Sequence, residues 1–195
     1  MRKIVIASGN HGKLREIRQI LAPLDFEVVP QSELGVPEAE EPHDTFLENA
    51  LEKARHASRI TGLPALADDS GICVHALNGE PGIHSARFAG APRSDERNNL
   101  RLLEELKNSA NRRAHFYCVI VYMRHAADPE PLIAEGRWEG EILEEYRGEG
   151  GFGYDPLFFD PDLGKSAAQL SHEIKNRVSH RARALSEFLR KLGCA

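Results

Sequence analysis

Two adjacent carboxyl groups, Asp68 and Asp69, lie between the apolar runs 63–67 and 72–77. Successive side chains of an extended chain point to opposite sides, so one carboxylate can meet a metal ion or water while neighbouring donors hold the other. The alternative is a surface turn, which Asp, Ser and Gly favour. Because both flanks are apolar, the buried acidic pair is the preferred interpretation.

A polar, glycine-rich turn precedes a helical pattern near the N-terminus. It consists of six consecutive residues, Ser8, Gly9, Asn10, His11, Gly12 and Lys13. Backbone amides at a helix start can face an anion, glycines permit close approach, and Lys13 adds a positive charge. The spacing differs from the GxxxxGK[ST] phosphate loop, and an ordinary strand-to-helix turn remains the alternative.

A second glycine-rich segment, residues 149–156, carries Phe152, Tyr154 and the hydrogen-bond acceptor Asp155. A flexible edge with aromatic rings suits the stacking of a purine or pyrimidine ring. The alternative is a hairpin bend whose aromatic side chains only pack.

Cationic side chains gather where the last helix is expected to begin. They are Lys175, Arg177, His180 and Arg181. The positive end of a helix dipole disfavours cations, which favours binding of an anionic ligand there, although a solvated polar face is the alternative. Lys53, on the polar side of the second expected helix, is a further candidate for a phosphate contact. Four other histidines lack a partner at metal-ligand spacing and are interpreted as non-ligands: His84, His115, His125 and His172.

Hydrophobic periodicity predicts the elements that position these residues. The expected strands are 3–7, 26–29, 116–123 and 132–138, and the expected helices begin near Leu14, Thr45, Ser94 and Lys175, the last running to Leu192. An irregular loop is expected at 30–44, a glycine- and proline-rich connection at 79–93, and extended chain at 64–77, interrupted by the acidic pair. Interspersed strands and helices around a central hairpin predict an α/β fold with a mixed sheet.

Length and composition bound the possible functions. The 195 residues, 41% hydrophobic, can bury one core, so we expect a single two-lobed domain over 1–195. A net charge of −5 argues against nucleic-acid and membrane partners. The first six residues leave no room for the apolar stretch of a signal peptide. Cys73, Cys118 and Cys194 form no CxxC pair, which indicates a cytoplasmic protein whose Cys73 and Cys118 are core residues on strands.

In this order, the segments resemble the inosine triphosphate pyrophosphatase family, which acts on non-standard purine nucleotides such as ITP, dITP and XTP. The similarity covers residues 4–189, and six markers in register make it specific. These markers are Ser8-Gly9-Asn10 with Lys13 and Glu16, residues 45–50 with Lys53 and Ala54, residues 67–71, residues 81–87, residues 151–156, and Ser179-His180-Arg181.

The resemblance implies hydrolysis between the α- and β-phosphates, Mg²⁺ dependence, a homodimer, and a two-lobed α/β fold whose mixed central sheet is flanked by helices, with a cleft between the lobes. It assigns Asp69 as general base, and Asp69 with Glu40 as metal-binding acids, although Glu38 and Glu41 share that loop and either can supply the carboxylate. The triphosphate contacts implied are Ser8, Gly9, Asn10, His11, Gly12, Lys13 and Lys53. The substrate pocket implied comprises Ser70, Phe152, Gly153, Tyr154, Asp155, Lys175, His180 and Arg181, with the aromatic stacking on the base and the last three reading its 6-keto edge.

Three other functions fit the sequence less well. A pyrophosphatase of the related septum-formation group, acting on pyrimidine or modified nucleotides, is disfavoured by Ser179-His180-Arg181. A catalytically silent nucleotide-binding regulator is disfavoured by the retention of Asp69 and the candidate cations. A nucleic-acid-binding module would be basic as a whole, whereas this chain is acidic.

Overall fold

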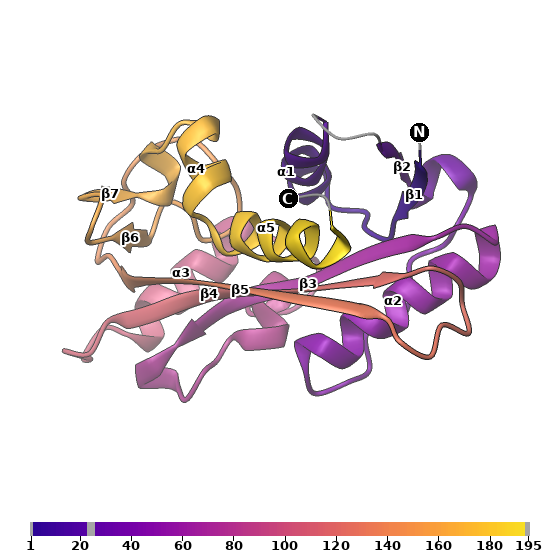
Figure 1. The fold of residues 1–195 in the computed structure, drawn as a ribbon. Coiled ribbons are helices and arrows are strands. Elements are labelled where there is room, and N and C mark those ends of the chain that lie inside the picture. The colour runs from indigo at the N-terminus through magenta and orange to yellow at the C-terminus, as the bar shows by residue number, and fades with distance from the viewer. Residues whose placement is uncertain (1, 23–25, 194–195) are drawn as a thin grey trace. The chain divides into compact units, whose positions relative to one another are not determined.

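The computed structural model describes residues 2–22 and 26–193, and these divide into two compact units (Figure 1). Unit 1 comprises the described residues of 1–69, 118–136 and 181–195, and unit 2 comprises 70–117 and 137–180. Cys194, one of the three cysteines considered above, lies outside the described residues.

The described residues contain a seven-stranded sheet with the strand order β2-β1-β3-β4-β5-β6-β7. Its strands are β1 Arg2–Ile6, β2 Phe26–Pro30, β3 Ala65–Val74, β4 Arg113–Met123, β5 Leu132–Ile142, β6 Phe158–Asp160 and β7 Lys165–Ser166. β1 is parallel to β2 and β3, whereas β6 is antiparallel to β5 and β7. The sheet is therefore mixed, as predicted, and β3, β4 and β5 each contribute residues to both units.

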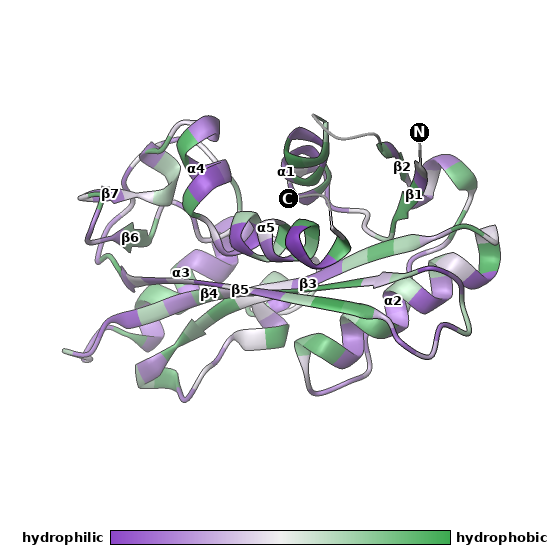
Figure 2. Cartoon of the chain, viewed as in Figure 1, coloured by the Kyte–Doolittle hydropathy of each residue, from purple (hydrophilic) through white to green (hydrophobic). Residues whose placement is uncertain are grey.

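Unit 1 builds its core where two helices, α1 His11–Leu21 and α5 His180–Leu192, pack on one face of its strands. The buried side chains on this face include Ile4, Ile6, Leu66, Cys118, Ile120, Ile17, Leu21, Leu185 and Phe188. Figure 2 shows hydrophobic and hydrophilic residues alternating along α5, as its packing requires.

The opposite face of the unit 1 strands is covered by α2, Phe46–Thr61 (Figure 1). Thr45 caps its first turn by accepting from the Glu48 amide, and Gly62 ends it at a φ of 68°. Ala50, Ala54 and Ala57 are fully buried on its inner side. Small residues let α2 approach the sheet closely, which brings its polar side chains near β3.

Unit 2 has its own core, formed by α3 Asp95–Glu105, by the unit 2 parts of β3, β4 and β5, and by the segment around β6. Its largest members include Phe116, Trp138, Tyr154 and Phe158. Ser94 caps α3 as predicted, accepting from the Arg97 amide. Short helix α4, His172–Val178, completes the unit.

Three sequence-based expectations need correction. β3 runs without a break through Asp68 and Asp69, so the acidic pair lies inside a strand. The expected last helix is two helices, α4 and α5, because Ser179 adopts an extended conformation with a φ of −67° and a ψ of 158°. The regions 30–44 and 79–93, expected to be irregular, contain the short 3₁₀ helices η1 Gln31–Leu34 and η3 Gly82–Arg87. Two further 3₁₀ helices, η2 His75–Leu77 and η4 Ala167–Gln169, follow β3 and β7.

Among the described residues, no helix combines the length and the apolar character that crossing a lipid bilayer requires.

Candidate active site

The turn after β1 is organised by Asn10. Its side-chain oxygen accepts from the amides of Gly12 (2.9 Å) and Lys13 (3.2 Å), and its own amide donates to the Ser8 hydroxyl (3.2 Å). Two amides that were expected to face an anion are thus bound within the turn. The carboxylate of Glu38 lies against Gly9, where a Cβ would displace it.

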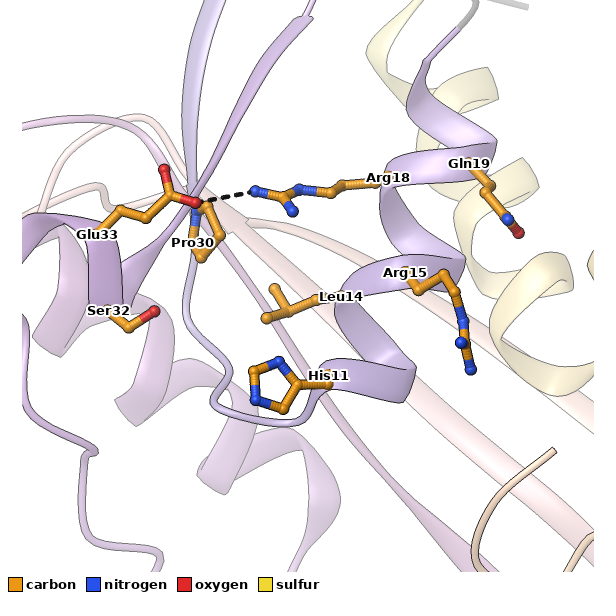
Figure 3. A pocket seen from close by; sticks show the side chains of 8 residues that line it. All are labelled: His11, Leu14, Arg15, Arg18, Gln19, Pro30, Ser32 and Glu33. Atoms are coloured by element: carbon orange, nitrogen blue, oxygen red, sulfur yellow. Dashed lines mark hydrogen bonds and ion pairs between the residues drawn. The ribbon is translucent and has the colours of Figure 1, made fainter.

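An open pocket of about 400 Å³ lies beside this turn (Figure 3). Five lining residues belong to α1, one ends β2 and two belong to η1. They are His11, Leu14, Arg15, Arg18, Gln19, Pro30, Ser32 and Glu33. Figure 3 shows Arg18 reaching across it to Glu33, at 3.1 Å. Of the predicted site residues, His11 is the one that lines this pocket.

Asp68 is buried against two cationic side chains of unit 1. Its Oδ2 atom lies 3.0 Å from Lys13 Nζ and accepts from Arg181 Nε (3.3 Å) and Nη2 (3.2 Å). Burial alone would raise the pKa of this carboxyl, but Lys13, Arg181 and Lys53 hold it well below its ordinary value. Asp68 is therefore ionised at neutral pH.

Arg181 connects Asp68 to a second acid. Its Nη1 atom donates to Glu16 of α1, and its side chain is almost fully buried between the two carboxylates. Burial alone would lower its pKa, but these two acids raise it. Glu16 belongs to the sequence markers, yet its pairing with Arg181, far along the chain, carries no signal in the sequence.

Asp69, the next residue of β3, contacts a different partner. Its Oδ1 atom accepts from Lys53 Nζ of α2 at 2.8 Å, and the same ammonium lies 2.8 Å from Glu41 Oε1. Burial raises the pKa of Asp69 above its ordinary value despite the nearby lysines. Burial alone would lower the pKa of Lys53, but the surrounding carboxylates raise it, so the ammonium stays charged. We call Lys13, Lys53, Asp68 and Asp69 the acid–lysine cluster.

The three candidate loop acids differ in their surroundings. All three are exposed, but Glu41 shares Lys53 with Asp69 and Glu38 approaches Gly9, whereas the described hydrogen bonds and ion pairs include none of the Glu40 side chain. Two carboxylates around one ammonium form an oxygen donor set that fits a hard divalent cation such as Mg²⁺. Ser70 follows Asp69 in β3 and is partly buried.

Unit 2 brings together four of the other predicted residues. Asp155 Oδ2 lies 2.6 Å from Lys175 Nζ and accepts from the Phe152 amide at 2.9 Å. The Lys175 ammonium lies 4.7 Å from the centre of the Phe152 ring. The Gly153 amide donates to Asp95 (2.7 Å), and its carbonyl accepts from Asn99 (2.9 Å). We call Phe152, Gly153, Asp155 and Lys175 the glycine-loop cluster.

Asp95 and Asn99 anchor this loop from α3, and neither was among the predicted site residues. Asp95 has the appearance of an ordinary acidic residue in the first turn of a helix, so the sequence holds no signal of the contact. Tyr154 belongs to the unit 2 core, and its hydroxyl donates to the Ser85 carbonyl at 2.8 Å. Phe152 is thus the more accessible aromatic of the loop.

His180, the last residue of unit 2, stacks on Phe116 with ring centres 4.7 Å apart and planes 11° from parallel. Both side chains are buried. Cys118 is a buried core residue of β4, as predicted, and burial raises its pKa to about 12. Cys73 lies on β3 and is partly buried.

Comparison with known proteins gives a consistent result. The model of the Ham1 family matches residues 4–191. The chain is similar to the dITP/XTP pyrophosphatase of Nitrosomonas europaea, at 65% identity over 98% of this chain and 95% of the relative. It is also similar to that of Ralstonia nicotianae, at 63% identity over 98% and 97% of the two chains.

Solved structures agree in fold. The chain is similar to a HAM1 protein from Coxiella burnetii, with a TM-score of 0.93 and 47% identity over the whole of both chains. It is also similar to the Staphylococcus aureus Ham1 protein, with a TM-score of 0.88 and 44% identity over 98% of each chain.

Proposed function

Because the chain belongs to the Ham1 family, we propose that it is a nucleoside triphosphate pyrophosphatase that converts ITP, dITP and XTP to their monophosphates and pyrophosphate. The names of the relatives from Nitrosomonas europaea and Ralstonia nicotianae support this activity. By removing non-standard purine nucleotides, the enzyme keeps them out of the nucleotide pool.

The observation that carries the proposal is the separation of roles within the acidic pair. Asp68 is held ionised by Lys13 and Arg181, whereas burial makes Asp69 a stronger base than an ordinary carboxylate. A carboxylate with a raised pKa is suited to accept a proton from an attacking water. We therefore assign Asp69 as the general base, with Lys53 orienting its carboxylate.

Lys13 and Lys53 supply the positive charge that a triphosphate needs. Each ammonium now pairs with a carboxylate, at 3.0 Å and 2.8 Å, and can exchange that partner for a phosphate oxygen. In the reaction, these lysines offset the negative charge that develops on the leaving pyrophosphate.

The proposed cofactor is Mg²⁺, held by Asp69 and an acid of the 38–41 loop. We favour Glu41 over Glu40 because Glu41 already shares a cationic partner with Asp69. When bound, Mg²⁺ polarises phosphate oxygens and neutralises their charge. The two carboxylates hold the ion, and Lys53 remains available for phosphate.

The glycine-loop cluster is the proposed base-binding part. Phe152 offers a ring for stacking, and Lys175 offers a donor to a 6-keto oxygen while Asp155 fixes its position. His180 is assigned to the same recognition. Adenine carries an amino group at this position and would leave the donors unpaired, which disfavours ATP.

Arg181 is better explained as a positioning residue than as a reader of the base. Its guanidinium is bound by Glu16 and Asp68, so its donors are directed at these acids. In this role it fixes the Asp68 carboxylate, which in turn orients Lys13.

We also propose a cytoplasmic homodimer without nucleic-acid or membrane partners. The acidic net charge disfavours nucleic-acid and anionic membrane partners, and the free thiols of Cys73 and Cys118, among the described residues, fit a reducing compartment. The dimer is what the resemblance to the family implies. Size-exclusion chromatography with light scattering measures the oligomeric state, and a monomer at micromolar concentration would contradict the dimer.

A substrate panel tests the proposed activity. Common and deaminated nucleoside triphosphates are incubated with the purified chain, with Mg²⁺ or with EDTA, and pyrophosphate and monophosphate are quantified. We expect both products from ITP, dITP and XTP in Mg²⁺ only, and much slower turnover of ATP. Release of orthophosphate, or equal turnover of all nucleotides, would overturn the proposal.

A further inference from the structure

Another group of side chains, in unit 2, carries the ligand types of a transition-metal site. His75, His115 and Glu139 each offer one ligand atom, and these atoms all lie within 4.8 Å of one another. The two imidazole rings meet edge to face, with centres 5.7 Å apart. None of the three belongs to the acid–lysine cluster or to the glycine-loop cluster.

The sheet explains why these residues meet. His115 lies on β4 and Glu139 on β5, and His75 directly follows β3, which is the other neighbour of β4. Along each strand, side chains alternate between the two faces. The neighbours Phe116 and Trp138 are buried in the unit 2 core, so His115 and Glu139 point away from it. The three side chains therefore gather on the outer face of three adjacent strands.

The group is already arranged around a cation. Arg137, also on β5, places Nη2 at 3.0 Å from His115 Nδ1 and Nε at 2.5 Å from Glu139 Oε1. Since a guanidinium can only donate, His115 Nδ1 presents its lone pair, which is the form that binds a metal. The Arg137 side chain is half exposed and can leave this position.

We propose that His75, His115 and Glu139 bind one divalent ion of the Zn²⁺ class, with the Arg137 guanidinium displaced. Two imidazoles and a carboxylate suit Zn²⁺, Co²⁺ or Ni²⁺, whereas Mg²⁺ prefers an all-oxygen set. Ligand atoms in a tetrahedral zinc site lie about 3.4 Å apart, so exposed side chains need only a small closure. The fourth position is left to water.

The ion would connect three neighbouring strands of unit 2. Its binding stabilises the folded chain, because the ligands come together only in the folded sheet. Arg137 acts as a competitor, since it contacts two of the three ligands and repels a second cation.

Isothermal titration of the untagged full chain with ZnCl₂, in excess Mg²⁺ to occupy all-oxygen sites, tests the proposal. We expect one Zn²⁺ per chain in the wild type. Affinity should fall at least tenfold in His75→Ala and His115→Ala, and rise in Arg137→Gln. His125→Ala, which removes an exposed histidine elsewhere, is the matched control and should bind as the wild type does.

Thermal unfolding with and without Zn²⁺ gives a second readout. The wild type should be stabilised by Zn²⁺, and both His variants should lose this shift while keeping their metal-free unfolding temperature. If an alanine variant fails to fold, His75→Gln and His115→Gln replace it. Zn²⁺ binding that is equal in the wild type and the His variants would overturn the proposal, as would Arg137→Gln binding no more tightly than the wild type.

Discussion

Lys53 Nζ lies 2.8 Å from Asp69 Oδ1, and both side chains are only about one-tenth exposed. The same ammonium bridges to Glu41. In a partly desolvated setting such an ion pair is stronger than at the surface. Lys53 thus keeps two acids close together that would otherwise repel each other, and these are the two acids proposed as ligands of Mg²⁺.

Removing the proposed general base should abolish most of the activity. In Asp69→Asn, kcat for ITP should fall by about 10²- to 10⁴-fold, because an amide cannot accept the proton of water. Steady-state kinetics measures the loss, and circular dichroism checks the fold. Asp162→Asn removes an exposed carboxylate of unit 2 and should leave kcat unchanged. An Asp69→Asn enzyme with undiminished kcat excludes this role.

The Mg²⁺ concentration needed for activity should depend on Glu41 and not on its neighbour Glu40. Glu41→Gln should raise the Mg²⁺ concentration for half-maximal activity by about tenfold or more, because it removes one charged ligand. Glu40→Gln, the matched control, should shift it little, since the ion pair with Lys53 is made by Glu41. Magnesium titrations of ITP turnover make the comparison. The reverse order of effects would assign the ligand to Glu40 instead.

Asp68 should contribute mainly to stability. In Asp68→Asn, the charges of Lys13 and Arg181 lose a buried partner, and the free energy of unfolding should fall by about 3 to 5 kcal/mol. Glu27→Gln, which removes an exposed ion pair with Lys3, should cost only about 0 to 1 kcal/mol. Urea unfolding in EDTA measures both.

The stabilising effect of Asp68 should depend on pH. The pKa of Asp68 is lowered by folding, so its stabilising effect is complete above the ordinary value of 3.8 and is lost as the pH falls towards the lower folded pKa. The stability difference between wild type and Asp68→Asn should therefore stay constant from pH 7 to about 5 and decline only in stronger acid. A difference that disappears between pH 7 and about 5 would contradict this assignment.

Anchoring of the glycine loop should affect substrate binding. Asp95→Ala removes the acceptor of the Gly153 amide, and KM for ITP should rise by about tenfold, the equivalent of one lost charged hydrogen bond. Glu96→Ala removes the next acid in the same helical turn, which has no contact with Gly153 among the described hydrogen bonds, and should leave KM unchanged. Equal effects of the two variants would mean that helix charge, not loop anchoring, is responsible.

The elements with strong periodicity were predictable from the sequence. The first helix, the Thr45 and Ser94 caps and the central strands agree with the expectations to within a few residues. The failures occur where distant partners override local preference. Asp, Ser and Gly favour a turn at 68–71, but Lys13, Lys53 and Arg181 neutralise the acids and allow β3 to continue.

The sequence singled out the residues of the acid–lysine cluster and the glycine-loop cluster, but it did not predict which of them pair. Arg181 was expected to act together with Lys175 and His180. In the structure α4 ends before Ser179, and Lys175 and His180 belong to unit 2 whereas Arg181 belongs to unit 1. His115 has no histidine at metal-ligand spacing in the sequence, whereas the structure brings it close to His75, at the start of η2. The choice between Glu40 and Glu41 depends on the path of one loop, which periodicity does not describe.

The continuity of β3 has a consequence for how its two acids are distinguished. Asp68 and Asp69 are adjacent in the strand, so their side chains point to opposite faces and contact different partners. With the start of the strand kept in register, an insertion of one residue between Ala65 and Asp68 would move the first carboxyl to the position beside Lys53 and the second to the position now held by Ser70. The position of each acid along β3 thus decides which one contacts Lys53 and which one contacts Lys13 and Arg181.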